Sequence, residues 1–183
     1  MPGKLIFVSS TRNDDRTALI RSALATIPRL HYVQTVTTRP PHDDETDSFA
    51  YKFVDDAAYQ SLKTVSAEWD HTDYRGHKYG IDVAAVKRLL ANGESVICVV
   101  PPDLLIVNAM ADHYGVTPVK IWIDTSANFT NNQPSDSLDR LSRAEHERLQ
   151  NAFDFAFRPS GEVIKDQAAF TRIINRITQK ETL

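Results

Sequence analysis

The chain of 183 residues is long enough to form one compact domain with a sizeable buried core. Apolar residues make up 42% and charged residues 25% of the sequence, a mixture typical of globular proteins rather than of disordered ones. The formal net charge of -3 offers no basic surface for an extended nucleic acid, and no apolar run has the length of a membrane span. We therefore expect a cytoplasmic protein that binds neither nucleic acid chains nor membranes.

The first half of the chain alternates between strand and helix patterns and then changes character. Short buried runs predict strands, apolar residues at helical spacing predict a helix, and Pro28 ends that helix. The expected elements are a strand at 4–9, a helix at 17–27, a strand at 31–36 and two short strands at 50–54 and 65–69, for which antiparallel pairing is one option. The polar segment 37–48 interrupts the alternation.

From Asp82 onward the strand-helix alternation resumes. Asp82 is a suitable N-cap for a helix with one apolar face, and Gly93 is a suitable residue to end it. The later expected elements are strands at 96–100, 118–124 and 153–157, and helices at 103–115, from 137 and around 170–177. Repeated units of this kind predict an α/β fold, in which a parallel sheet of about five strands is flanked by helices.

Four short motifs occur in a fixed order in the middle of the chain. They are TVTTRPP at 35–41, FAYKFV at 49–54, EW at 68–69 and GHKYG at 76–80. Each is common by chance, but the four together are far more specific. Their order resembles the acceptor-binding signature of guanylate kinases, and the resemblance covers most of the chain and is strongest over 35–93.

The resemblance implies a P-loop kinase-like core that carries two additional parts within a single domain over 1–183. The core would comprise 1–31, 82–124 and 137–183. A small insert at 32–81 would bind the acceptor, which is GMP in the family, and the polar segment 125–136 would form a short lid. The segment 125–136 contains no Lys or Arg, whereas the family carries arginines there to clamp the donor phosphates.

The resemblance also implies a set of acceptor-binding residues. A monophosphate needs a forked cation and neutral hydroxyl donors, and guanine needs a carboxylate for its N1-H and amine. The implied phosphate ligands are Arg39, Tyr51 and Tyr79, with His42 in place of a second arginine; Glu68 would bind the guanine edge, and Thr35 would replace the family's serine. The alternative is that Arg39 is an ordinary solvated arginine and Tyr51 a core aromatic with a solvated hydroxyl.

Two departures concern the base end of this site. Glu68 and Tyr79 are separated by two residues more than in the family, and we expect the extra residues in a hairpin turn at 73–76. Ile81 stands where the family has a small hydroxyl residue, and its side chain cannot hydrogen-bond a base. Guanine selectivity is therefore less well supported by the sequence than phosphate binding.

The donor side departs further from the family. Guanylate kinases have a glycine-rich loop between the first strand and helix, but the equivalent run STRNDDRT at 10–17 contains no glycine. Asn13 and Asp15 occupy two glycine positions, Arg16 replaces the lysine, and Thr17 retains a hydroxyl suitable for Mg. Asp14 and Asp15 would repel a polyphosphate. Arg16 and Arg140 are the remaining candidates for stabilising a transferred phosphoryl group.

These residues leave three hypotheses about function. The first, which we favour, is a catalytically impaired guanylate kinase-like protein whose acceptor pocket binds a nucleoside monophosphate or another phosphorylated ligand, a protein partner included. The alternative is an active nucleotide kinase that uses ATP and Mg and transfers a phosphoryl group to GMP or a related acceptor. The third is an interaction module that binds no small ligand.

Overall fold

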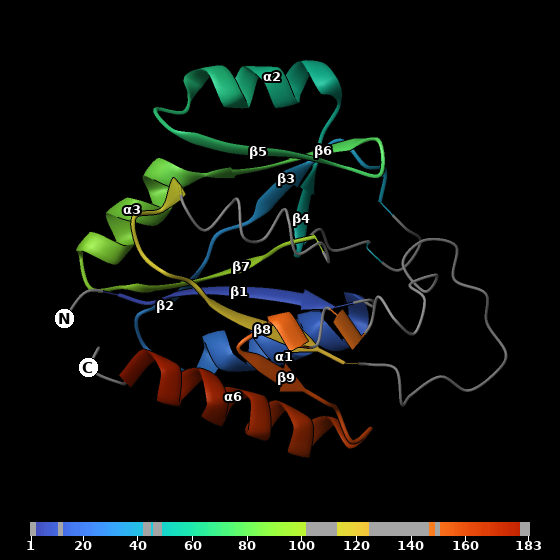
Figure 1. The fold of residues 1–183 in the computed structure, drawn as a ribbon, viewed down its shortest axis with the longest axis vertical. Helices are drawn as coiled ribbons and strands as arrows, with labels where there is room; N and C mark the ends of the chain where they lie inside the picture. Colours follow the sequence, from blue (N-terminus) through green and yellow to red (C-terminus); the bar gives the residue numbers. More distant parts are fainter. Residues whose placement is uncertain are drawn as a thin grey trace, which may run out of the picture.

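The structure, a computed structural model, describes residues 3–10, 13–41, 45, 49–101, 113–124, 147–148 and 151–179. For residues 13–15 only the backbone is described. Within these ranges the chain forms a five-stranded core sheet and a four-stranded second sheet, with helices packed around them (Figure 1). The helices are α1 (Asn13–Thr26), α2 (Asp56–Val65), α3 (Val83–Ala91) and α6 (Val163–Gln179).

The core sheet is parallel throughout and has the strand order β2-β7-β1-β8-β9. Its strands are β1 (Leu5–Ser10), β2 (Leu30–Tyr32), β7 (Ser95–Val99), β8 (Val119–Ile123) and β9 (Phe155–Phe157). Strands buried on both faces read as continuous apolar runs, which is why the sequence predicts the three central strands well. The predicted α/β class and five parallel strands are confirmed.

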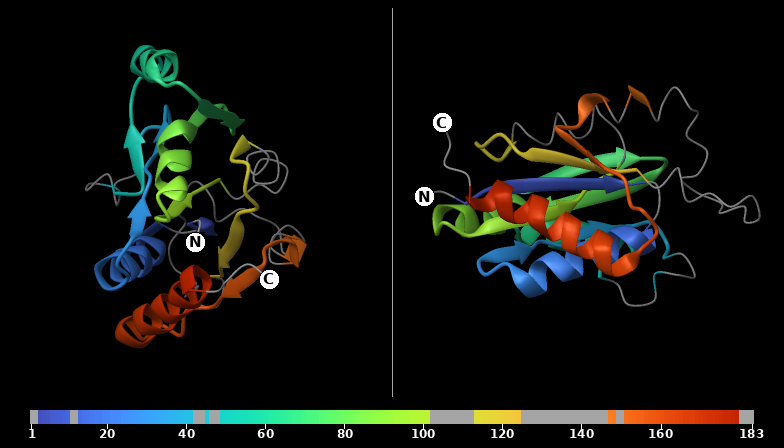
Figure 2. Two further views of the ribbon diagram at one scale, coloured as in Figure 1. Left: turned by 90° about the vertical axis from the view of Figure 1, so that its left-hand side faces the viewer. Right: turned by 90° about the horizontal axis from the view of Figure 1, so that it is seen from below.

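The two faces of the core sheet are covered by different helices. Along β1, Ile6 and Val8 pack with apolar residues of α1 and α6, whereas Leu5 and Phe7 pack with residues of α3. Alternate side chains of a strand point to opposite faces, so one short apolar run serves both cores. Figure 2 shows α1 and α6 side by side on one side of the sheet.

The second sheet has the strand order β4-β3-β6-β5 and is built from the middle of the chain. Its strands are β3 (Thr35–Thr37), β4 (Tyr51–Phe53), β5 (Trp69–Tyr74) and β6 (His77–Asp82). The β5–β6 hairpin turns at Arg75 and Gly76, which have positive φ angles of 51° and 79° as a tight two-residue turn requires. Helix α2 covers one face of this sheet (Figure 1). We call the opposite face, which is directed at the core sheet, the inner face.

Several predicted boundaries are wrong. Helix α1 begins at Asn13, four residues before the expected start, and the strand expected at 31–36 is divided between β2 and β3 in different sheets. The strand expected at 65–69 is instead the end of α2 and the connection to β5. Helix α2 has a mostly polar sequence, and its N-cap bond from Ala58 N to Asp55 Oδ1 is 2.7 Å long. Tyr59 is its one buried side chain, so its apolar face gives little signal in the sequence.

The elements after Asp82 agree better with expectation where the structure describes them. Asp82 caps α3 by accepting a hydrogen bond from Ala85 N at 3.0 Å, and the chain leaves the helix through Gly93 with a φ of 74°. The expected helix at 103–115 lies almost wholly outside the described residues, and the lid at 125–136 and the start of a helix at 137 lie outside them entirely. No helix within the described ranges is both long enough and apolar enough to cross a membrane.

Candidate functional site

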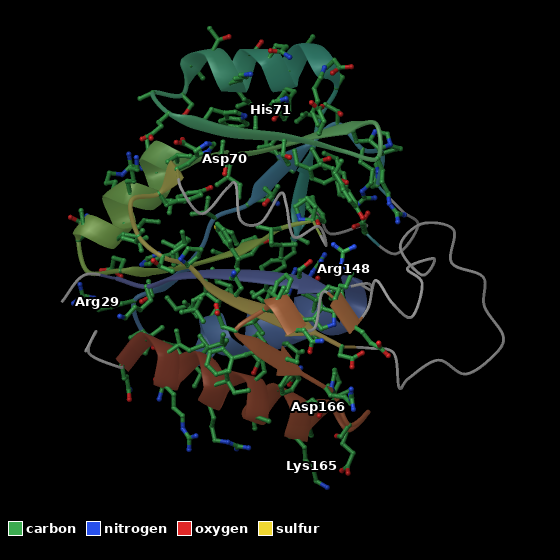
Figure 3. The ribbon with its side chains drawn as sticks, in the orientation of Figure 1. Arg29, Asp70, His71, Arg148, Lys165 and Asp166 are labelled. Carbon is green, nitrogen blue, oxygen red and sulfur yellow. The ribbon has the colours of Figure 1, made fainter. Side chains whose placement is uncertain are left out.

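The inner face of the second sheet collects most of the side chains that the sequence singles out. In antiparallel and parallel ladders, paired residues share a face, and every second residue along a strand returns to it. Thr37 pairs with Tyr79, Thr35 with Tyr51, and Asp70 with Ile81, and all six lie on the inner face. His71 lies on the α2 side of β5 and Asp70 on the opposite side (Figure 3).

Arg39, Tyr51 and Tyr79 come together at one end of this face. The rings of Tyr51 and Tyr79 meet edge to face with centroids 5.9 Å apart, and Cζ of Arg39 lies 5.4 Å from the Tyr51 centroid. Burial raises the pKa of the Tyr79 hydroxyl, while hydrogen bonds from Thr37 and Arg39 act in the opposite direction. One forked cation and two hydroxyl-bearing rings are thus assembled at one end of the inner face.

The guanidinium of Arg39 forms an ion pair with the carboxylate of Glu45. Its Oε1 accepts a hydrogen bond from Nη2 of Arg39 at 2.7 Å, and the two side chains are only 6% and 13% exposed. Burial lowers the pKa of Arg39, but the hydrogen bond and the charge of Glu45 together raise it by more. Nη1 of Arg39 donates to the Pro40 carbonyl at 2.9 Å. Any anion that binds Arg39 must therefore compete with the carboxylate of Glu45.

Helix α1 brings a second guanidinium to the same place. Arg16 is 2% exposed, and its Cζ lies 5.6 Å from the centroid of the Tyr51 ring. Burial raises the pKa of the neighbouring Tyr32, and the positive charge of Arg16 acts against that rise. The residue expected in place of a donor-loop lysine thus lies against a ring expected in the acceptor site. Thr17 follows it in α1 and is partly buried.

The base end of the predicted site differs from expectation. Glu68 precedes β5, is exposed, and pairs with Lys87 of α3 at 2.6 Å. The β5–β6 ladder runs without a break from the Trp69–Asp82 pair to the Tyr74–His77 pair, and its turn at Arg75 and Gly76 falls within the expected 73–76. In the family, the glutamate lies two residues closer to the tyrosine than Glu68 lies to Tyr79. Counting back from Tyr79 at the family's spacing leads to Asp70, which is also a carboxylate.

Asp70 is the buried carboxylate of the inner face. It is 2% exposed, and its two oxygens accept hydrogen bonds from His113 Nδ1 at 3.0 Å and Tyr114 Oη at 3.2 Å. Burial raises its pKa, and the charges and hydrogen bonds of His113, Tyr114 and His71 act in the opposite direction. These bonds connect the second sheet to the segment that precedes β8.

Thr35, expected in the acceptor site in place of a serine, bonds to the core sheet. Its hydroxyl donates to the carbonyl of Val99 at 2.6 Å, and the side chain is 1% exposed. Ile81, which is fully buried, packs in the apolar cluster that includes Tyr114 and Phe7. Thr35 and Ile81 therefore take part in the packing between the two sheets.

Sequence reasoning found part of the site and missed two of its carboxylates. Glu45 lies in a polar segment and carried no motif, although it is only six residues from Arg39. Asp70 could have been found by counting back from Tyr79 at the family's spacing. Four predicted residues cannot be placed as side chains, because His42 and Arg140 lie outside the described residues and Asn13 and Asp15 are described by backbone only. No cluster of three or more His, Cys, Asp or Glu side chains suited to a metal ion occurs in the part of the chain that the structure describes.

Comparison with known proteins places this geometry in context. No protein-family model matches the sequence. The chain is 29% identical over 160 residues to the guanylate kinase of Neisseria meningitidis serogroup A, a match that covers 84% of this chain and 78% of the relative. It is 34% identical over 97 residues to a guanylate kinase of Thermus thermophilus, covering 53% of this chain and 44% of the relative.

A solved structure shares the fold along nearly the whole chain. The crystal structure of guanylate kinase from Anaplasma phagocytophilum superimposes with a TM-score of 0.63 at 18% sequence identity. The match covers 98% of this chain and 88% of the other. The arrangement of core sheet, flanking helices and second sheet is thus the arrangement of a guanylate kinase.

Proposed function

Because the chain belongs to the guanylate kinase family, we propose that it binds a phosphorylated ligand, in the simplest case a nucleoside monophosphate, on the inner face of the second sheet. We further propose that it transfers phosphoryl groups from ATP far more slowly than an ordinary guanylate kinase. Arg39, Tyr51 and Tyr79 hold the ligand's phosphate in this proposal. ATP and Mg take part only in whatever transfer activity remains.

The assembly of Arg39 with the two tyrosines is the observation that carries the first part. The guanidinium can donate two parallel hydrogen bonds to a phosphate, and each tyrosine hydroxyl can add one neutral donor. Arg16 lies against the same Tyr51 ring, so its charge adds to the field that attracts a dianion. Glu45 must rotate away or share the guanidinium when the ligand binds, because its carboxylate already accepts from Arg39.

The absence of glycine from the donor region supports the second part. No glycine lies between Gly3 and Gly76, so the backbone after β1 lacks the residues that let N-H groups wrap donor phosphates. Helix α1 places Asp14 and Asp15 in its first turn, where the donor polyphosphate would bind. Phosphoryl transfer depends mainly on positioning and on stabilisation of negative charge, and both are weakened there.

Calorimetric titration and a coupled assay test the two parts separately. GMP should bind saturably, and Arg39→Ala should abolish most of that binding, whereas the exposed α3 residue Arg88 can be replaced by Ala as a control without loss. Turnover with ATP, Mg and GMP should fall well below about 1 per second, the lower end for ordinary kinases. Turnover in the ordinary range would establish the alternative, an active kinase with an unusual donor loop. Absence of GMP binding would refute the first part.

A further inference from the structure

We propose that this site binds the phosphate of its ligand and does not distinguish between bases. The reason is that His113 and Tyr114 already hydrogen-bond the carboxylate of Asp70, which a base would otherwise contact. The inference rests on the proposed function, since it concerns the ligand of the same site. It specifies the ligand class as phosphomonoesters in general, rather than guanine nucleotides in particular.

The position of Asp70 follows from the strand register. Tyr79 marks the phosphate end, and the next inner-face pair along the β5–β6 ladder is Ile81 with Asp70. One such step is about 6.8 Å in an antiparallel sheet, comparable with the distance from a nucleotide's phosphate to its base. On the other side of Tyr79 the ladder ends at the hairpin turn after Tyr74. A base that extends along the inner face from a phosphate at Tyr79 therefore extends toward Asp70.

Both carboxylate oxygens of Asp70 already accept a hydrogen bond from the chain itself. Oδ1 accepts from His113 Nδ1 at 3.0 Å and Oδ2 from Tyr114 Oη at 3.2 Å, and the residue is 2% exposed. A guanine that donates from N1-H and its amine needs both carboxylate oxygens. Each oxygen can accept a second hydrogen bond, but Asp70 is so deeply buried that a base reaches it only if His113 or Tyr114 moves aside.

Displacement of Tyr114 is opposed by its packing. The ring is 2% exposed, meets Phe7 edge to face with centroids 5.6 Å apart, and belongs to the apolar cluster shared with Ile81. Moving it would open a cavity beneath the second sheet, which costs more than the exchanged hydrogen bonds return. Thr35 is committed in a similar way through its bond to Val99. The phosphate end, by contrast, needs only the rotation of Glu45.

Titration of four phosphomonoesters tests the inference. GMP, AMP, CMP and ribose 5-phosphate should bind the wild-type chain with dissociation constants within about threefold of one another. A preference of about tenfold or more for any one base would overturn the inference and leave the proposed function standing, since a charged hydrogen bond to a base is sufficient for such a preference. If none of the four binds, the proposed function itself is refuted.

A double variant tests the role assigned to the two blocking residues. His113→Ala with Tyr114→Phe removes both donors to Asp70 while the aromatic ring keeps its packing, and circular dichroism checks that the fold is retained. A preference for GMP over CMP should then appear, and adding Asp70→Asn should abolish it. If the folded double variant still binds GMP and CMP equally, Asp70 does not lie at the base and the inference fails.

Discussion

Replacing Glu45 with glutamine should tighten phosphate binding, although it removes an ion pair from the fold. Glu45 and Arg39 are joined at 2.7 Å with side chains 6% and 13% exposed, so the pair is largely screened from water. Glutamine keeps the size of the side chain and an oxygen that accepts from Arg39, but it carries no charge. The substitution therefore isolates the electrostatic part of the competition between Glu45 and the ligand.

The magnitude can be estimated from the geometry. A phosphate bound to the same guanidinium would lie about 4.5 Å from the carboxylate, where two like charges repel by roughly 4 kcal/mol at an effective dielectric constant of about 20. Rotation of Glu45 relieves much of this, so we expect a gain of about 1.4 kcal/mol or more, a tenfold lower dissociation constant. The free energy of unfolding should fall by about 1.5 to 3 kcal/mol, because the buried guanidinium of Arg39 loses its opposite charge and keeps only a hydrogen bond to a neutral oxygen.

Isothermal titration with inorganic phosphate and with GMP, at constant ionic strength, measures the first effect, and urea denaturation measures the second. Glu94→Gln is a matched control, because Glu94 also pairs with an arginine, Arg29, at 3.2 Å. Arg29 lies near the chain termini, away from the second sheet (Figure 3). The control should leave phosphate affinity unchanged. Equal or weaker phosphate binding by Glu45→Gln would show that Glu45 does not compete with the ligand.

Three further substitutions test the packing that supports the site. Tyr59→Phe removes the hydroxyl that donates to the Tyr79 carbonyl at 2.8 Å, and urea denaturation should show a loss of about 1 to 3 kcal/mol. Gly80→Ala would place a Cβ 2.4 Å from the Trp69 ring, so it should lower the free energy of unfolding by about 1 to 3 kcal/mol, and an unchanged value would show that the ring moves freely. Burial raises the pKa of Asp70, so its protonated form stabilises the fold below about pH 4 and this contribution is lost as the pH rises through the raised pKa. The stability of Asp70→Asn relative to wild type should therefore increase from about pH 4 to pH 7, and a constant difference would contradict the assignment.

The sequence predicted the three central strands of the core sheet because they are continuous apolar runs, and it predicted α3 because Asp82 and Gly93 are strong boundary signals. It failed in the second sheet for physical reasons. Helix α2 buries only Tyr59, and its other apolar residues, such as the exposed Val65, form no buried stripe, so its pattern did not stand out from a loop. The expected strand at 65–69 was inferred from local residue types, without the tertiary pairing that starts β5 at Trp69.

The site shows the same division between local and long-range information. Arg39, Tyr51 and Tyr79 were predicted because each lies in a short motif at a fixed spacing. Glu68 was predicted because it forms a Glu-Trp motif with Trp69, and the ladder between β5 and β6 shows that the carboxylate on the inner face with Tyr79 is Asp70. The bonds from His113 and Tyr114 join residues more than forty positions apart, which no local pattern indicates.

The affinity of GMP for wild type, Arg39→Ala and Tyr51→Phe, measured by calorimetry at one ionic strength, tests the central claim most directly. The account predicts that Arg39→Ala weakens binding by about 1.5 to 3 kcal/mol and Tyr51→Phe by about 1 kcal/mol, since the first removes a charge-assisted pair of bonds and the second one neutral donor. If Arg39→Ala binds GMP as tightly as wild type, the inner face of the second sheet is not the phosphate site.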